Sequence, residues 1–183
     1  MNNDRIPSIK ECYELMRHTG MLPNIFDHSK QVMRVALAIV DNLSNETEIN
    51  RDLVIAASLL HDITKTISIK TKEPHDITGG KYLKKIGFDH IACIVEEHVY
   101  IKDFNFNSKL TESEVVNYAD KRVMHKKIVS VDERIADLVI RYGKTPEIRS
   151  IIINNKNNIL LLESKISKYM KRDLHTVISD IEA

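Results

Sequence analysis

The segment Asp52–Ile63 is apolar on almost every side, and this feature constrains the fold of the chain more than any other. A helix that is apolar all round must be covered by other elements on all of its faces. The rest of the chain supplies such elements, because apolar residues recur at helical spacing along its whole length. No stretch alternates apolar and polar residues for long enough to predict a strand. We therefore expect an all-α fold, a helical bundle with the 52–63 helix at its centre.

Start and stop residues place the other helices. Ser8 and Gly20 bound a first helix, and Thr111 with Glu114 forms a capping box for a later one. We expect loops at 21–27, 65–74 and 100–110. The predicted helices are 8–19, 28–43, 52–63, 76–86, 90–99 capped by Asp89, 112–125, 131–142 ended by Gly143, a region from Thr145-Pro146 interrupted at Asn154–Asn158, and a short helix from Asp173 to about 181.

Composition excludes several classes of protein. The 27 Lys and Arg residues are balanced by 26 Asp and Glu, so no overall charge attracts nucleic acid or a membrane surface. No apolar run approaches the roughly 18 residues that span a bilayer. The first eleven residues lack the basic-then-apolar order of a secretory signal, so the expected compartment is the cytoplasm. Cys12 and Cys93 are predicted to be buried small apolar residues rather than a disulfide or zinc ligands.

Ionisable residues fall on the apolar faces of the predicted helices. His28 and His98 are in phase with the apolar stripes of their helices, and Asp120 lies on the buried side of its own. His61 and Asp62 are adjacent in the most apolar helix of the chain. Each histidine alone is more often a hydrogen-bonded core residue than a ligand. Several buried carboxylates and imidazoles together need a common partner, and a shared cation meets that need.

The donor types limit which cation is expected. Imidazole and carboxylate suit Fe, Mn, Zn, Co or Ni, and Mg is possible where carboxylates dominate. We therefore predict one or two divalent metal ions.

The order His28, then His61-Asp62, then Asp120 within Tyr118-Ala119-Asp120-Lys121 resembles the signature of the HD-domain superfamily of metal-dependent phosphohydrolases. The resemblance covers about 25–142, and 145–183 would be an additional C-terminal helical extension of a single domain, 1–183. The stand-alone HDIG-type group is the most similar. Its central motif reads HDIGK, whereas this chain has Thr64 in place of Gly and keeps Lys65.

The resemblance also implies a ligand set. His28, His61, Asp62 and Asp120 would hold a first metal. Members with two metals have two further histidines, and here those would be His75 and His98, with Asp62 bridging the ions. Asp27 and Asp76 are expected to be helix caps. The histidines that match no position of the signature, and are expected at the surface or at helix ends, are His18, His90, His125 and His175.

By this resemblance the chain would be a phosphomonoesterase or phosphodiesterase for a nucleotide or similar small phosphorylated substrate. A metal-activated hydroxide would attack phosphorus, with Asp62 holding the metals. Lys65 would bind a phosphate oxygen or protonate the leaving group. Two alternatives remain open, namely a di-iron oxygenase with the same ligands and a non-catalytic regulatory domain.

Substrate specificity is expected in the loops 64–75 and 99–110. Phe104 and Phe106 suit either stacking on a base or anchoring the second loop to the core. The sequence gives no indication of the oligomeric state.

Overall fold

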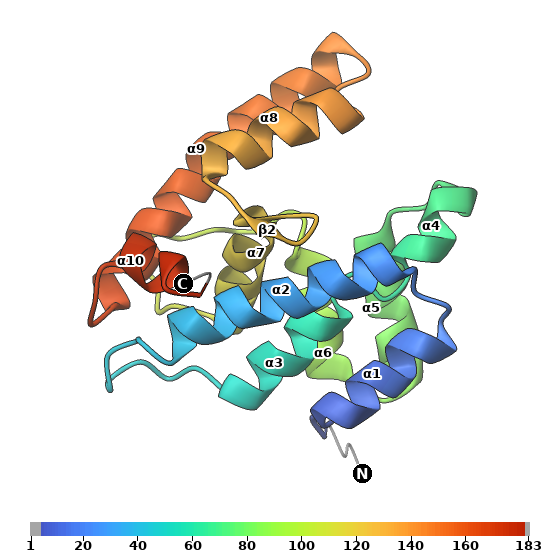
Figure 1. Cartoon of the computed structure of the whole chain (residues 1–183), viewed down its shortest axis with the longest axis horizontal. Coiled ribbons are helices and arrows are strands. Elements are labelled where there is room, and N and C mark those ends of the chain that lie inside the picture. The colour runs from blue at the N-terminus through green and yellow to red at the C-terminus, as the bar shows by residue number, and fades with distance from the viewer. Residues whose placement is uncertain (1–4, 182–183) are drawn as a thin grey trace.

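The computed structural model describes residues 5–181, and helices make up most of this range (Figure 1). The all-α prediction is confirmed, with one short antiparallel hairpin as an addition. The helices are α1 Ile9–His18, α2 Pro23–Val40, α3 Arg51–Leu60, α4 Lys65–Thr71, α5 His75–Lys85, α6 Asp89–Glu97, α7 Glu112–Lys121, α8 Val131–Tyr142, α9 Pro146–Tyr169 and α10 Leu174–Ser179, and the strands are β1 Val123–Met124 and β2 Lys127–Ile128.

Helix α3 lies at the centre, as its apolar sequence predicts. It packs against α1, α2, α6 and α7, and every residue from Val54 to Leu60 is buried. The helix ends three residues earlier than expected, so that His61 is its C-cap and a tight turn continues to Thr64. The turn sets the His-Asp pair at the end of the central helix, among the helices that surround it.

Most helix ends that the sequence predicts are present. Capping boxes form at Ser8 with Glu11 and at Thr111 with Glu114. Gly20 follows α1 with a φ of 67°, a left-handed conformation that suits glycine. Thr145 caps α9 and Asp173 caps α10, each accepting a hydrogen bond from a backbone amide of the first turn.

Three predicted caps are wrong. Helix α2 begins at Pro23 rather than at 28, because proline suits the first helical position and needs no side-chain cap. Asp27 therefore lies inside α2. Asp76 and Asp89 lie in the first turns of α5 and α6, where their charge favours the helix without capping it.

The segment predicted as a loop at 65–74 contains α4. None of the side chains of α4 is buried, so the sequence carries no apolar stripe to reveal the helix. Thr66 accepts a hydrogen bond from the amide of Leu22, which ties α4 to the segment before α2. Lys72, with a φ of 64°, ends the helix.

Helix α7 ends at Lys121 instead of 125, and the strands β1 and β2 follow it. Two hydrogen bonds between Arg122 and Val129 close the base of the hairpin that these strands form. The amide of Val129 donates to the Arg122 carbonyl at 2.9 Å, and Arg122 Nε donates to the Val129 carbonyl at 2.8 Å. His125 occupies the turn with a φ of 58°.

Helix α9 is continuous, so the predicted interruption at Asn154–Asn158 is wrong. Ile159, Leu162 and Ile166 are buried and keep the second half of α9 packed against the body of the protein, including α7. The first half pairs with α8, and Figure 1 shows this helical pair projecting from the other helices. Tertiary packing thus outweighs the weak helix propensity of asparagine.

The two cysteines differ. Cys12 is buried as predicted, but Cys93 is exposed, because α6 turns Ile91, Ile94 and Val95 inward and leaves Cys93 on the opposite side. Among residues 5–181, no helix has the length and apolar character needed to cross a membrane. Residues 1–4 of the amino-terminal segment considered as a signal lie outside the described range.

Candidate metal centre

The predicted metal ligands come from separate helices that meet beside the end of α3. Most are buried, and His75 is the most accessible of them, with 20% of its side chain exposed. The set comprises His28 in α2, His61 and Asp62 in the turn after α3, His75 at the start of α5, His98 at the C-cap of α6 and Asp120 in α7.

One group of donor atoms surrounds His61. Its Nε2 atom lies 3.6 Å from Asp62 Oδ2 and 3.8 Å from Asp120 Oδ1. His28 Nε2 lies 2.9 Å from the same oxygen of Asp120. His28, His61 and Asp62 offer ligand atoms that all lie within 4.8 Å of one another. This spacing allows one cation to contact all of them.

A second group shares Asp62. Asp62 Oδ1 lies 3.1 Å from His75 Nε2 and 3.5 Å from His98 Nε2. The two imidazole nitrogens are 3.2 Å apart. The carboxylate thus presents Oδ2 to the first group and Oδ1 to the second, which is the arrangement needed to bridge two ions.

Hydrogen bonds fix the tautomers of three of these histidines. Each donates its Nδ1 proton to a backbone carbonyl, which holds the ring with its Nε2 atom facing the carboxylates. Metal-bound histidines commonly have this second hydrogen bond. The Nδ1 partners are the carbonyl of His125 for His28 at 2.9 Å, of Ser58 for His61 at 2.8 Å and of Val95 for His98 at 2.6 Å.

His61 gives the clearest test of whether a metal fits. Its side chain is fully buried, and Nε2 has no hydrogen-bond partner among the described residues. A buried imidazole nitrogen without a partner is costly. Because two carboxylates face that nitrogen, a divalent cation would satisfy all three groups. The residues present therefore fit a metal ion.

The protonation states agree with this fit. Burial lowers the pKa of His61 to about 3, so its imidazole is neutral at physiological pH. Burial alone would raise the pKa of Asp62, but the Lys65 charge and the neighbouring histidines outweigh it and hold that pKa well below the usual range. Burial would likewise raise the pKa of Asp120, but Lys121 and His28 hold that pKa well below the usual range. Neutral imidazoles and ionised carboxylates are the forms that bind metals.

Two lysines accompany the carboxylates. Lys65 Nζ lies 3.3 Å from Asp62 Oδ1 and 3.0 Å from His75 Nε2. Burial would lower the pKa of Lys65, but the negative charge of Asp62 and Asp120 raises it, so the ammonium stays protonated. Lys121 Nζ donates to Asp120 Oδ2 at 2.7 Å. Lys65 is the more accessible lysine, with 28% of its side chain exposed.

Arg134 was not identified from the sequence. It lies in α8, is 8% exposed, and places one guanidinium nitrogen 3.7 Å from Asp120 Oδ1. Its Nε atom has no hydrogen-bond partner within residues 5–181. Arg134 is three residues after Val131 and four before Leu138, both partly or fully buried. The histidines were identified as ionisable residues on the apolar faces of helices. The same pattern would have identified Arg134.

The remaining histidines lie outside both groups. All four are exposed. His125 touches the centre through its backbone only, by accepting the hydrogen bond from His28. Their positions are the end of α1 for His18, the first turn of α6 for His90, the hairpin turn for His125 and the start of α10 for His175.

Comparison with known proteins gives a family match. The family model described as "HD domain" matches residues 25–125, which is more than half of the chain. This range includes every residue of both donor groups. The search of solved structures gives no significant match.

Three curated relatives are similar over part of their length. The dihydroneopterin 2',3'-cyclic phosphate phosphodiesterase of Methanocaldococcus jannaschii is 29% identical over 135 residues, which cover 64% of this chain and 49% of that protein. The tRNA (cytidine(56)-2'-O)-methyltransferase of Thermoplasma volcanium is 32% identical over 95 residues, 51% of this chain and 26% of that protein. The ribonuclease Y of Fusobacterium nucleatum is 30% identical over 92 residues, 49% of this chain and 17% of that protein.

This chain spans about half the length or less of each of these relatives. The match over residues 25–125 shows that the chain belongs to the HD-domain family.

Proposed function

We propose that the chain is a metal-dependent phosphohydrolase that cleaves a phosphate ester of a nucleotide or a similar small molecule. The observation that carries this proposal is the convergence of three histidine Nε2 atoms on two ionised carboxylates, with His61 Nε2 left without a partner in the described range. Membership of the HD-domain family supports it. So does the likeness to a relative whose name is that of a phosphodiesterase.

The residues would divide between two ions. His28, His61, Asp62 and Asp120 would hold one, and His75 and His98 would hold the other together with Asp62. Divalent ions, when bound, lower the pKa of water towards neutrality and neutralise charge on phosphoryl oxygens. Asp62 would be a ligand common to both ions. The Nδ1 hydrogen bonds of the three histidines hold the rings in place for this task.

Lys65 is the best-placed group to contact substrate. It is charged, partly exposed and adjacent to both Asp62 and His75. A cation at this position would bind a non-bridging phosphate oxygen and hold phosphorus over the metal ligands. The Lys65 ammonium would also be able to donate a proton to the oxygen of the leaving group. Arg134 and Lys121 would add positive charge on the Asp120 side of the centre.

The names of the similar proteins indicate a substrate class. The names of the relatives refer to a pterin cyclic phosphate and to RNA, so their common feature is a heterocycle joined to a phosphate ester. We propose the same general class for this chain. The metal would be Fe, Mn, Zn, Co or Ni, or Mg, because these suit the imidazole and carboxylate donors.

Release of phosphate or of a phosphomonoester product tests the proposal. The purified protein would be incubated with Mn²⁺ or Mg²⁺ and a panel of nucleotides, cyclic nucleotides and dinucleotides. Asp62→Ala removes the shared carboxylate, and we expect it to abolish turnover and lower metal content. Turnover that persists at full rate in Asp62→Ala would contradict the proposal, as would metal-loaded protein that hydrolyses nothing on the panel.

A further inference from the structure

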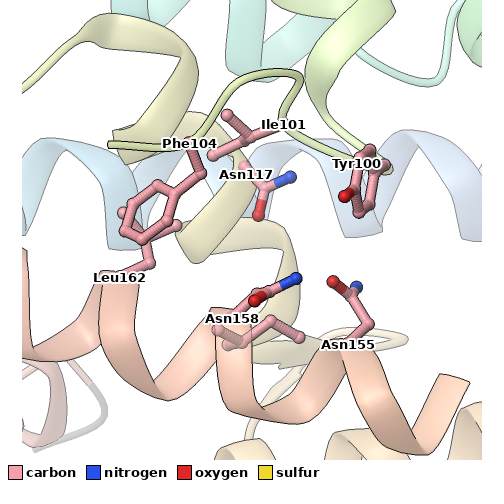
Figure 2. Close-up of a pocket in the computed structure, with 8 residues that line it drawn as sticks. Tyr100, Ile101, Phe104, Asn117, Asn155, Asn158 and Leu162 are labelled. Carbon is pink, nitrogen blue, oxygen red and sulfur yellow. The ribbon is translucent and has the colours of Figure 1, made fainter. Parts of the chain in front are cut away.

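A small cavity lies between the middle of α9 and the loop that follows α6 (Figure 2). Its volume is about 20 Å³. One side is apolar and the other carries neutral hydrogen-bonding groups, with no charged side chain on the wall. The apolar residues are Ile101, Phe104, Ile159 and Leu162, and the polar ones are Tyr100, Asn117, Asn155 and Asn158.

Asn117 presents a hydrogen-bond acceptor of fixed orientation. Its Nδ2 atom donates to the backbone carbonyls of Glu97 at 2.9 Å and of His98 at 3.0 Å. Because both amide protons are used, the side chain cannot flip without losing two hydrogen bonds. Figure 2 shows the Asn117 oxygen directed toward the asparagines of α9, across the cavity. A group that enters the cavity therefore meets a carbonyl oxygen.

Two asparagines of α9 line the cavity, and of these Asn155 is half-buried and Asn158 is exposed. Neither the Asn155 nor the Asn158 side chain makes a hydrogen bond to any residue of the described part of the chain. Asparagine in a helix interior is less favourable than alanine by roughly half a kcal/mol. Residues that break a local rule without a packing gain are expected at functional sites. These two amides face the cavity, where each can turn its oxygen or its nitrogen inward (Figure 2).

The cavity selects its occupant by size and by charge. A volume of about 20 Å³ holds one small group and excludes a whole ring. The absence of charge on its lining favours a neutral group. The fixed acceptor of Asn117 requires that group to be a donor. Tyr100, which is 57% exposed at the cavity mouth, offers a flat surface on which a ring could lie outside.

The cavity is next to the proposed metal centre. Tyr100 comes two residues after His98, so their Cα atoms are at most about 7 Å apart. Asn117 holds the carbonyl of His98 directly and lies one turn before Asp120. Residues of the cavity and of the proposed centre thus follow one another closely on the same two segments, 98–100 and 117–120.

We propose that the cavity binds an exocyclic amino group of a nucleobase-like ring, with the ring against Tyr100. This inference rests on the proposed function, because it names the part of the substrate that lies beyond the phosphate. It assigns Asn155 and Asn158 to substrate selection, along with the oxygen of Asn117. The predicted preference is for adenine, guanine or cytosine over uracil and hypoxanthine, which lack an exocyclic amino group.

Nucleosides test the cavity without the phosphate. Calorimetric titrations of the full chain would compare adenosine, guanosine and cytidine with inosine and uridine. At least one amino-bearing nucleoside should bind about tenfold more tightly than its amino-free counterpart, as expected for the loss of one or two hydrogen bonds. The double variant Asn155→Ala/Asn158→Ala should lose this preference. The matched control Asn154→Ala/Asn157→Ala changes two exposed asparagines of the same helix and should keep it.

Three results would overturn the inference. They are equal affinity for every amino-bearing nucleoside and its amino-free counterpart (guanosine and inosine included), a preference that survives in Asn155→Ala/Asn158→Ala, or no binding by any of the nucleosides. Hydrolysis of p-nitrophenyl phosphate, which has no heterocycle, is measured in parallel. Ester hydrolysis without amino preference rejects the cavity and keeps the proposed function. Amino preference without hydrolysis of any ester rejects the function and keeps the cavity as a binding site.

Discussion

Two of the buried charge clusters in residues 5–181 are built differently. In the first, Lys165 is fully buried and its Nζ donates to Glu114 Oε1 at 2.7 Å. The same ammonium reaches the carbonyls of Asn105 and Lys109 and the hydroxyl of Ser108. Every donor and acceptor of this closed cluster finds its partner within the chain.

The cluster around His61 is open by comparison. His61 Nε2 has no hydrogen-bond partner in the part of the chain that the structure describes, and it faces two carboxylates. The contrast teaches that burial of charge does not by itself indicate a functional site. A closed cluster stabilises the fold, whereas an open cluster of neutral imidazoles and ionised carboxylates calls for a ligand from outside.

The largest effect is expected from breaking the closed cluster. Lys165→Met leaves the Glu114 carboxylate buried without its cation, and we expect the free energy of unfolding to fall by about 3–5 kcal/mol. Urea unfolding of the metal-free protein measures the change. The control Lys168→Met alters an exposed lysine of the same helix and should cost less than about 1 kcal/mol. Equal effects of the two substitutions would contradict the claim that the closed cluster stabilises the fold.

The next effect concerns Lys65 in the open cluster. Lys65→Ala removes a charge that would bind the substrate phosphate, and we expect kcat/KM for a phosphate ester to fall by about a hundredfold. Metal content should be unchanged, because Lys65 is not a ligand. Lys70→Ala, an exposed lysine on the same helix, should leave both quantities unaltered. Loss of metal from Lys65→Ala would show that the lysine supports the centre itself.

The smallest effect is a pH dependence of the protein's stability that arises from the open cluster. The pKa of His61 is about 3 in the folded protein and returns to about 6.5 in the unfolded chain. Below pH 6.5 the unfolded chain binds a proton that the folded protein does not, so stability falls as the pH drops toward 3. The depressed pKa values of Asp62 and Asp120 add a loss only below about pH 4.

Between pH 7 and pH 5, the metal-free protein should therefore lose about 2 kcal/mol more stability than His61→Gln does. Urea unfolding at the two pH values gives the comparison. Identical losses in the two proteins would mean that the pKa of His61 in the fold is not lowered from its ordinary value, and this would contradict the neutral imidazole that the account assigns to it at pH 5.

The sequence predicts the open cluster well because the signal is local. His61 and Asp62 stand out against the apolar residues before them, and capping residues such as Ser8 and Thr111 mark helix ends within a few positions. The prediction that these residues meet follows from the order of the signature. Their role as metal ligands stays a prediction until metal is measured.

The features that the sequence did not reveal depend on contacts between distant segments. Helix α4 has no buried side chain, and the asparagine-rich part of α9 stays helical because buried residues further along the helix hold it in place. The hairpin after α7 forms around contacts of Arg122 with Val129. The closed cluster joins Lys165 to Glu114, and no short-range pattern indicates such a pair.

The central claim is that His61 belongs to a metal site, and direct metal binding tests it best. Calorimetric titration with Mn²⁺ would compare the unmodified protein with His61→Gln, and with His18→Gln as a control at an exposed histidine. We predict binding to the unmodified protein and to His18→Gln, with at least about tenfold weaker binding to His61→Gln. Equal affinity in all three proteins, or no binding to the unmodified protein, would contradict the account.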